Sequence, residues 1–140
     1  MLGKSHRLMA ASGAVLLGAS PLCAAAAALG ATLPDRIEVV GLPHRGISHW
    51  PWAWAAAVWS IQTQQSQWST LLAWWLAGAL FHIAADLFTI GGIPLILPNW
   101  RIRLGMLRTG GVGEYVAVAL AVIAALMHVF HLQIVRAAGS

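Results

Sequence analysis

Two segments of this chain are apolar over the full length of a membrane helix. They comprise residues 68–88 and 114–135, and a helix needs about 20 predominantly apolar residues to cross the hydrocarbon core of a bilayer. Charged residues make up only 9% of the 140-residue chain, whereas a soluble domain has roughly 25%. This is too little charge to cover a soluble surface. The sequence therefore predicts a single-domain integral membrane protein over residues 1–140.

Two further apolar segments predict shorter helices. Residues 8–33 are interrupted by Gly-Ala-Ser-Pro at positions 18–21, where Ser suits a helix N-cap and Pro a first turn. These local signals leave two alternatives open, a helical hairpin and one helix kinked at Pro21. Residues 50–61 are too short for a normal span, and their Trp side chains suit a membrane–water boundary. The expected fold is an all-α membrane bundle of about four to five helices, some of them short or half-spanning.

The polar connections predict the orientation of the chain. If residues 50–61 and 68–88 form a hairpin, the segments 35–49 and 89–113 lie on one side of the membrane. Five of the eight basic residues are in these segments, namely Arg36, Arg45, Arg101, Arg103 and Arg108. The positive-inside rule then places this side in the cytoplasm of a multi-pass protein of a bacterial inner membrane. Basic residues spread over the whole chain form no nucleic-acid patch, so membrane lipid is the expected contact.

His82 and Asp86 are the first candidate site residues, because ionisable groups inside a membrane segment are costly and often functional. Their spacing of four places both side chains on one helix face. Gly91-Gly92 follows closely, so the pair lies near a membrane face. Imidazole and carboxylate are ligands for zinc, and also for iron or manganese. The alternative is a His–Asp hydrogen bond that satisfies two buried polar groups.

A second group of candidates lies before the Trp-rich segment. Residues 44–49 read His-Arg-Gly-Ile-Ser-His, with His44 and His49 on either side of a turn that Gly46 permits. Asp35 and Glu38 precede them on the same predicted side. The two groups together predict a metal site at one membrane face.

With these motifs, the chain resembles the LexA-regulated, membrane-bound, metal-dependent hydrolase family. The resemblance rests on Leu33-Pro34-Asp35, the 44–49 motif, and His82-x3-Asp86 followed by Gly91-Gly92-Ile93-Pro94. It implies a divalent metal, with zinc expected first and manganese or iron left open, and a distant similarity to zinc-dependent phospholipases C. The ligand candidates that it implies are His6, Asp35, His44, His49, His82 and Asp86.

The resemblance also favours the hairpin, because a hairpin returns His6 and Asp35 to the same membrane face. Relatives often continue the Leu-Pro-Asp segment with a second Asp and a His, whereas this chain reads Arg36-Ile37-Glu38-Val39. Either Glu38 replaces that Asp, or a second metal position is lost.

Three functions follow from these residues. The first is a hydrolase that acts on a lipid-associated ester or phosphodiester, with Glu38 or Asp35 as the catalytic carboxylate. In it, Arg45, Arg101 and Arg103 would bind a phosphate group, although topology anchoring and contact with anionic lipids are the favoured role of these residues. The second is a non-catalytic membrane protein with a structural or ion-handling metal site. The third is a structural subunit without metal. The sequence predicts neither the substrate nor the oligomeric state.

Overall fold

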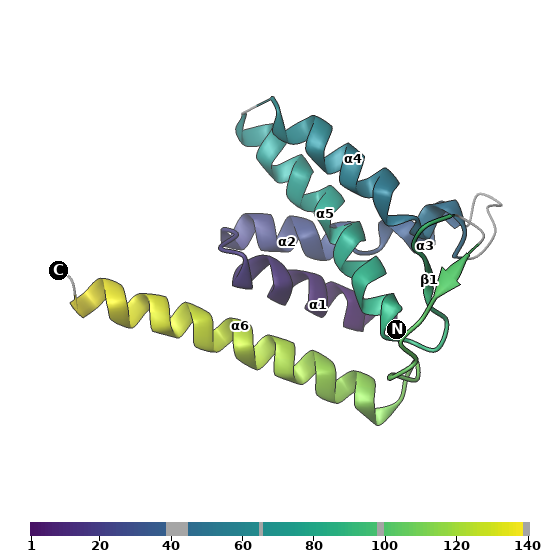
Figure 1. Cartoon of the computed structure of the whole chain (residues 1–140). Coiled ribbons are helices and arrows are strands. Elements are labelled where there is room, and N and C mark those ends of the chain that lie inside the picture. The colour runs from purple at the N-terminus through teal and green to yellow at the C-terminus, as the bar shows by residue number, and fades with distance from the viewer. Residues whose placement is uncertain (39–44, 65, 98–99, 139–140) are drawn as a thin grey trace.

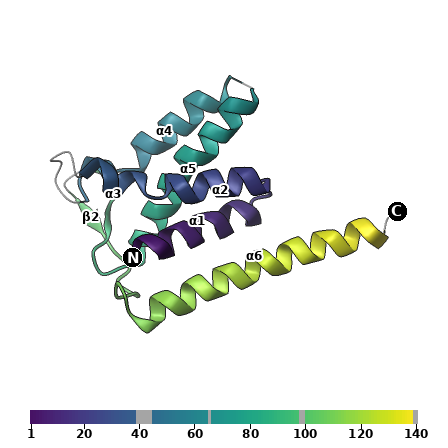
Figure 2. The ribbon, with the colours of Figure 1, turned by 180° about the vertical axis from the view of Figure 1, so that it is seen from behind.

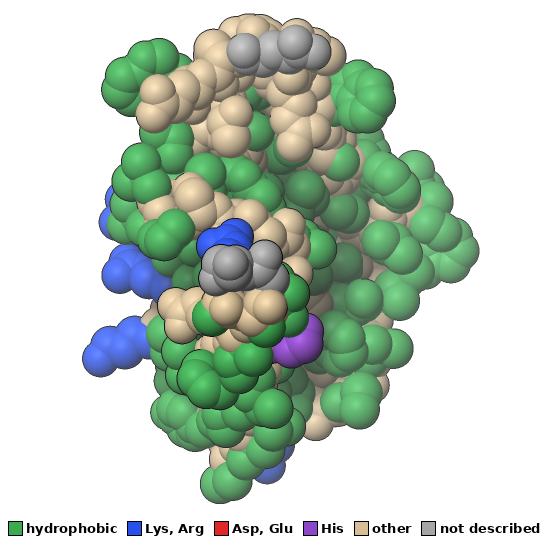
Figure 3. Space-filling model, turned by 90° about the vertical axis from the view of Figure 1, so that its left-hand side faces the viewer, with side chains coloured by type: hydrophobic (Ala, Val, Ile, Leu, Met, Phe, Trp, Pro, Cys, Tyr) green, Lys and Arg blue, Asp and Glu red, His purple; other side chains and the backbone are tan. Residues whose placement is uncertain are grey.

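The computed structural model describes residues 1–38, 45–64, 66–97 and 100–138 of the chain. Its elements are almost all helical, as the sequence predicts. Two helices, α5 (Gln67–Leu87) and α6 (Val112–Ala138), are long and apolar enough to cross a membrane. They correspond to the predicted segments 68–88 and 114–135. Hydrophobic side chains cover most of the face that lies at the C-terminal end of α6 (Figure 3), as expected for contact with lipid.

The first apolar segment forms a helical hairpin of α1 (Gly3–Leu16) and α2 (Pro21–Gly30). Ser20 is the N-cap of α2, and its hydroxyl oxygen accepts a hydrogen bond from the Cys23 backbone N–H at 3.3 Å. Pro21 occupies the first helical position, where its missing N–H costs nothing. The hairpin is therefore confirmed, and the alternative of one helix kinked at Pro21 is wrong.

A second hairpin joins α4 (Pro51–Gln62) to α5. At the start of α5, Ser66 and Ser69 form a reciprocal capping box, which satisfies N–H groups of the first turn. Before α4, the chain forms the short helix α3 (Leu33–Glu38) and the 3-10 turn η1 (Ile47–His49). Figures 1 and 2 show the two hairpins side by side, with α6 packed along α1.

Glycine allows α2 and α5 to cross at very short range. A Cβ atom on Gly30 would overlap the carbonyl group of Trp75, and one on Gly78 would overlap the carbonyl group of Ala27. Small residues at a crossing let two helix backbones approach closely, which is a common device between membrane helices. This crossing brings the C-terminal end of α2 against the second half of α5.

The connection between α5 and α6 contains a small sheet that the sequence did not predict. Strands β1 (Ile93–Pro94) and β2 (Arg101–Ile102) pair antiparallel, with Ile93 opposite Ile102. A bridge between Thr89 and Leu107 extends this structure toward α6. The segment thus covers the C-terminal end of α5, at the end of the bundle where the N-termini of α1 and α6 also lie (Figure 1).

Candidate metal centre

Four side-chain donor atoms converge at this end of the bundle. The Nε2 atoms of His49 and His82 lie 3.2 Å apart. Asp35 Oδ1 is 3.6 Å from the first and 3.4 Å from the second, and Asp86 Oδ2 is 3.6 Å from each. A tetrahedral zinc ion with bonds of about 2.0–2.1 Å keeps neighbouring ligand atoms about 3.3 Å apart. The spacing and chemistry of these donors therefore fit a zinc-sized cation.

Each of these ligand candidates is placed by the end of a helix or turn. His82 and Asp86 lie one turn apart in the last part of α5, Asp35 is in the first turn of α3, and His49 ends η1 directly before α4. His49, His82 and Asp86 are fully buried, whereas the Asp35 side chain is 48% exposed. The cluster therefore opens toward solvent on the Asp35 side.

The close crossing of α2 and α5 orients His82. Its Nδ1 atom is 2.7 Å from the carbonyl oxygen of Ala31, just beyond the end of α2. Because a carbonyl oxygen only accepts hydrogen bonds, His82 Nδ1 carries a proton, and Nε2 is the nitrogen that faces His49 and the two carboxylates. A ring held through one nitrogen in this way presents the other nitrogen as a metal ligand.

Glu38 orients His49 in the same manner. His49 Nδ1 donates to Glu38 Oε1 at 2.8 Å, and the Ser48 hydroxyl donates to the same oxygen at 2.8 Å. The Arg45 backbone N–H donates to it as well, at 2.6 Å. A carboxylate that holds the outer nitrogen of a ligating His is the usual second layer of a zinc site. The contacts of Glu38 thus direct the Nε2 lone pair of His49 toward His82.

The electrostatics leave the His49 ring neutral and the Asp35 carboxyl charged at neutral pH. Burial, reinforced by the neighbouring His82, lowers the pKa of His49 to about 4. Burial alone would raise the pKa of Asp35, but its hydrogen bond with His82 outweighs this effect and brings that pKa below its usual value. A neutral imidazole and an ionised carboxylate are the forms that bind a metal.

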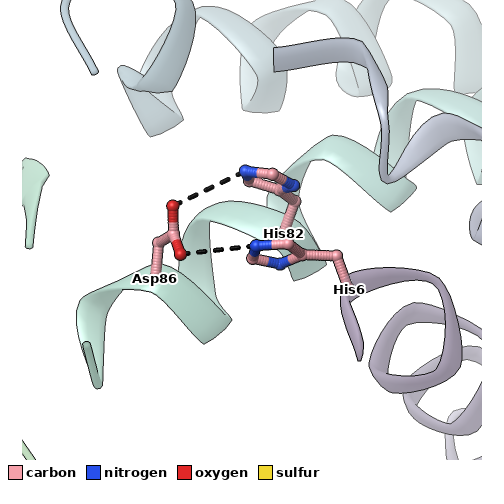
Figure 4. Close-up of side chains that lie close together, drawn as sticks. All are labelled: His6, His82 and Asp86. Carbon is pink, nitrogen blue, oxygen red and sulfur yellow. Dashed lines mark ion pairs between the residues drawn. The ribbon is translucent and has the colours of Figure 1, made fainter. Parts of the chain in front are cut away.

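His6 joins the cluster from α1. Its ring stacks on that of His82 with the centroids 3.6 Å apart, and its Nε2 atom lies 3.4 Å from Asp86 Oδ1 (Figure 4). His6, His82 and Asp86 form a second group close enough to hold a metal, and it shares two members with the first. The His6 Nδ1 atom is buried and has no hydrogen-bond partner among the described residues.

Arg45 turns its guanidinium inward, onto Asp86. Its Nη2 atom is 3.2 Å from Asp86 Oδ2, and its Nη1 atom donates to Thr89 Oγ1 and to the Gly92 carbonyl oxygen, both at 3.3 Å. A Cβ atom on Gly91 would overlap this guanidinium, so only glycine leaves room for it.

The other predicted phosphate-binding residues, Arg101 and Arg103, lie on the exposed surface of the β1–β2 region. Arg103 donates to the Ile90 carbonyl oxygen at 3.2 Å.

Other contacts of the cluster had no signal in the sequence. The α-amino group of Met1 lies 2.9 Å from Asp86 Oδ1, and the Ala31 carbonyl is a backbone group that no side-chain pattern indicates.

Glu114, fully buried at the start of α6, accepts hydrogen bonds from the backbone N–H groups of Leu2 and Gly110 at 2.8 and 2.9 Å. It ties the start of α1, and with it His6, to α6. His44 lies outside the described residues.

Comparison with known proteins identifies the family of this chain. A family model described as YdjM inner membrane protein matches residues 1–138. Neither a curated protein nor a solved structure matches the chain. The match agrees with the apolar spans α5 and α6. The chain therefore belongs to the YdjM inner membrane protein family.

Proposed function

We propose that this protein is a membrane-bound, metal-dependent hydrolase that acts on a lipid-associated ester or phosphodiester. The observation that carries the proposal is the convergence of four donors: the Nε2 atoms of His49 and His82 lie 3.2 Å apart, and an oxygen of Asp35 and one of Asp86 each lie within 3.4–3.6 Å of both nitrogens. A divalent metal in this position, with zinc the first expectation, supplies Lewis acidity and activates water near neutral pH. Manganese and iron accept the same ligand types.

The exposed side chain of Asp35 marks the side from which water or substrate would reach the proposed metal. Three donors are buried and held by other groups, whereas the Asp35 side chain is half-exposed and belongs to a helix of only six residues. A catalytic metal site keeps one position for water or substrate. Asp35 is the donor that solvent reaches. It could therefore leave the metal so that water takes its coordination position, or it could accept a proton from that water. Glu38, in contact with His49 Nδ1, is better placed to orient that ring, and its role as a general base stays a prediction.

The position of the Arg45 guanidinium supports a substrate that is anionic or that develops negative charge during the reaction. Its guanidinium contacts Asp86 Oδ2 and so lies directly beside the proposed metal position, where it can stabilise negative charge that develops on a reacting oxygen. In our proposal the cluster faces the cytoplasm in a multi-pass protein, because the basic residues of the α5–α6 connection lie at the same end.

A non-catalytic metal site is the second candidate. Four protein donors match in number the closed ligand set of structural zinc sites, which leave no position for water. The two functions predict the same metal content and differ in turnover.

Elemental analysis of detergent-purified protein tests the shared premise. We expect about one equivalent of metal in the wild type and a loss of that metal in His82→Ala and Asp86→Ala. His128→Ala is the matched control, because His128 lies toward the other end of α6. Unchanged metal in both site variants would overturn the site. Cleavage of phospholipids and phosphodiesters by the metal-loaded wild type then separates the candidates, since a structural site predicts full metal without turnover.

A further inference from the structure

A pocket of about 270 Å³ lies between three helices near the end of the bundle that carries the metal cluster. It is lined by Met1 at the chain start, Met9 of α1, Ala85 and Phe88 of the α5 end, Met106 and Leu107 of the connection, and Ala117 of α6. No polar side chain lines it. The Met side chains give it an adaptable wall, because Met is flexible and fills irregular spaces.

The surroundings of the pocket indicate an acyl chain as its occupant. Along α6, only Glu114, Val118 and Ala125 are buried among the described residues, and the helix packs mainly against α1. In a helix apolar enough to span a membrane, the remaining surface faces lipid. An open apolar pocket beside such a helix is therefore filled by the hydrocarbon of the bilayer.

The charge beside the pocket indicates an anionic headgroup. Arg108 directly follows Leu107 of the pocket wall, and the Arg103 guanidinium lies on the Ile90 carbonyl, two residues beyond Phe88. Both Arg residues are exposed, and within the described parts of the chain neither has a carboxylate partner. The nearest acidic residue in sequence, Glu114, is buried and engaged with Leu2 and Gly110. These two positive charges are thus available to a phosphate.

We propose that this pocket binds one anionic phospholipid, with an acyl chain between α1, α5 and α6 and the phosphate on Arg103 and Arg108. Guanidinium groups suit phosphate oxygens, and anionic lipid is attracted to basic residues at the membrane surface. The lipid is a resident of the fold and not a substrate of the metal cluster, because His82 and Asp86 are buried and the cluster opens on the Asp35 side. The inference does not depend on hydrolysis.

Native mass spectrometry of the full chain tests the proposal. Defined lipids are added to the protein in detergent, and the detergent is removed in the spectrometer. The probes are phosphatidylglycerol and phosphatidylcholine with identical acyl chains. We expect the wild type to retain one phosphatidylglycerol about tenfold more than phosphatidylcholine, since each Arg near the surface adds attraction for anionic lipid. Ala117→Trp should fill the pocket and lose both lipids. The double substitution Arg103→Gln and Arg108→Gln should keep binding but lose the preference.

Two matched controls carry the same changes elsewhere. Ala124→Trp adds the same bulk to α6 away from the pocket, and Arg136→Gln removes a charge at the far end of that helix; both should behave as the wild type. Equal retention of the two lipids by the wild type, or full retention by Ala117→Trp, overturns the proposal.

A second measurement needs no variant. Phosphatidylglycerol with a photoreactive group on its acyl chain should label wild-type peptides that contain Ala85–Phe88 or Met106–Leu107. Labelling spread evenly over α4 and α6 instead would also overturn the site.

Discussion

The Nε2 atoms of His49 and His82 face each other at 3.2 Å, although the two residues are 33 positions apart in the sequence. Both rings use the Nδ1 proton elsewhere, His49 toward Glu38 and His82 toward Ala31. The two buried Nε2 atoms therefore face one another, with two carboxylates beside them. Buried polar groups of this kind need compensation, which a cation among them supplies, whether a proton on the imidazoles or a metal ion.

Metal removal should consequently destabilise the protein. At a free metal concentration of 100 times Kd, binding adds about 2.7 kcal/mol to the stability of the folded state, and the ligands join α3, η1 and α5. We expect EDTA treatment to lower the thermal unfolding midpoint in detergent, and zinc to restore it. Asp86→Ala should show the same midpoint with and without EDTA; a wild-type midpoint that EDTA leaves unchanged would contradict a metal-linked fold.

Substitutions of Glu38 distinguish an orienting role from a general base. If Glu38 orients His49, Glu38→Ala should weaken metal binding by about 10–100-fold, as loss of an outer partner of a ligating His commonly does. Glu38→Gln keeps an oxygen that accepts from Nδ1 and should weaken it less. Competition with a chromophoric chelator measures both affinities. Wild-type affinity in both variants, together with lost turnover, would instead assign Glu38 to catalysis.

Gly91→Ala should displace Arg45 without touching any metal ligand. The added Cβ overlaps the Arg45 guanidinium, so this side chain must leave Asp86. We expect metal content to stay near that of the wild type while turnover falls by about 10²-fold, the order lost when one charge-stabilising group is removed. Gly113→Ala is the control, because its Cβ meets only the flexible end of Leu107. Equal turnover in the two variants would exclude a role for Arg45 in the reaction.

Gly78→Ala should loosen the crossing of α2 and α5. The new methyl group overlaps the backbone of Ala27, and overpacking of this kind costs about 1–3 kcal/mol. Unfolding in mixed detergent micelles measures the change. Gly3→Ala, which meets nothing within 4 Å, should stay within about 0.5 kcal/mol of the wild type. Because the crossing also presents Ala31 to His82, Gly78→Ala should weaken metal binding, and a destabilised variant with unchanged affinity would separate the two effects.

Cysteine labelling should place the metal cluster on the cytoplasmic side. In a Cys23→Ser background, Arg36→Cys should react with a membrane-impermeant maleimide in inverted vesicles and stay unlabelled in intact spheroplasts. Arg136→Cys, at the end of α6, should show the opposite pattern, since a single span separates it from the cluster end of the bundle. Labelling of both positions from one side would refute the orientation.

Local chemistry explains how much of this structure could be predicted. The apolar runs located α5 and α6, because spans depend on neighbouring residues, whereas Ser20-Pro21 marked only a break in the first segment and the resemblance decided for the hairpin. His49 of the His-Arg-Gly-Ile-Ser-His motif and the His82–Asp86 pair were singled out by sequence, and the structure brings these three residues together. In these cases the relevant interactions act within one helical turn or follow a known motif.

The contacts that the sequence did not predict are long-range. The carbonyl of Ala31 reaches His82 only because Gly30 and Gly78 let two helices cross closely, and no local pattern reports that crossing. The inward turn of Arg45 depends on Thr89 and the Gly91–Gly92 backbone, 44 or more positions away. The β1–β2 pair is only two residues long in each strand, too short for a period-2 signal.

The length of the α1–α2 hairpin bears on how the chain enters the membrane. Helices of 14 and 10 residues extend about 21 and 15 Å, less than a hydrocarbon core of about 30 Å. A hairpin this short enters and leaves by the same face. In the proposed orientation, with the cluster end in the cytoplasm, Lys4 and Arg7, which precede the turn of the hairpin, would need no translocation, and the most costly step for basic residues would be avoided during insertion.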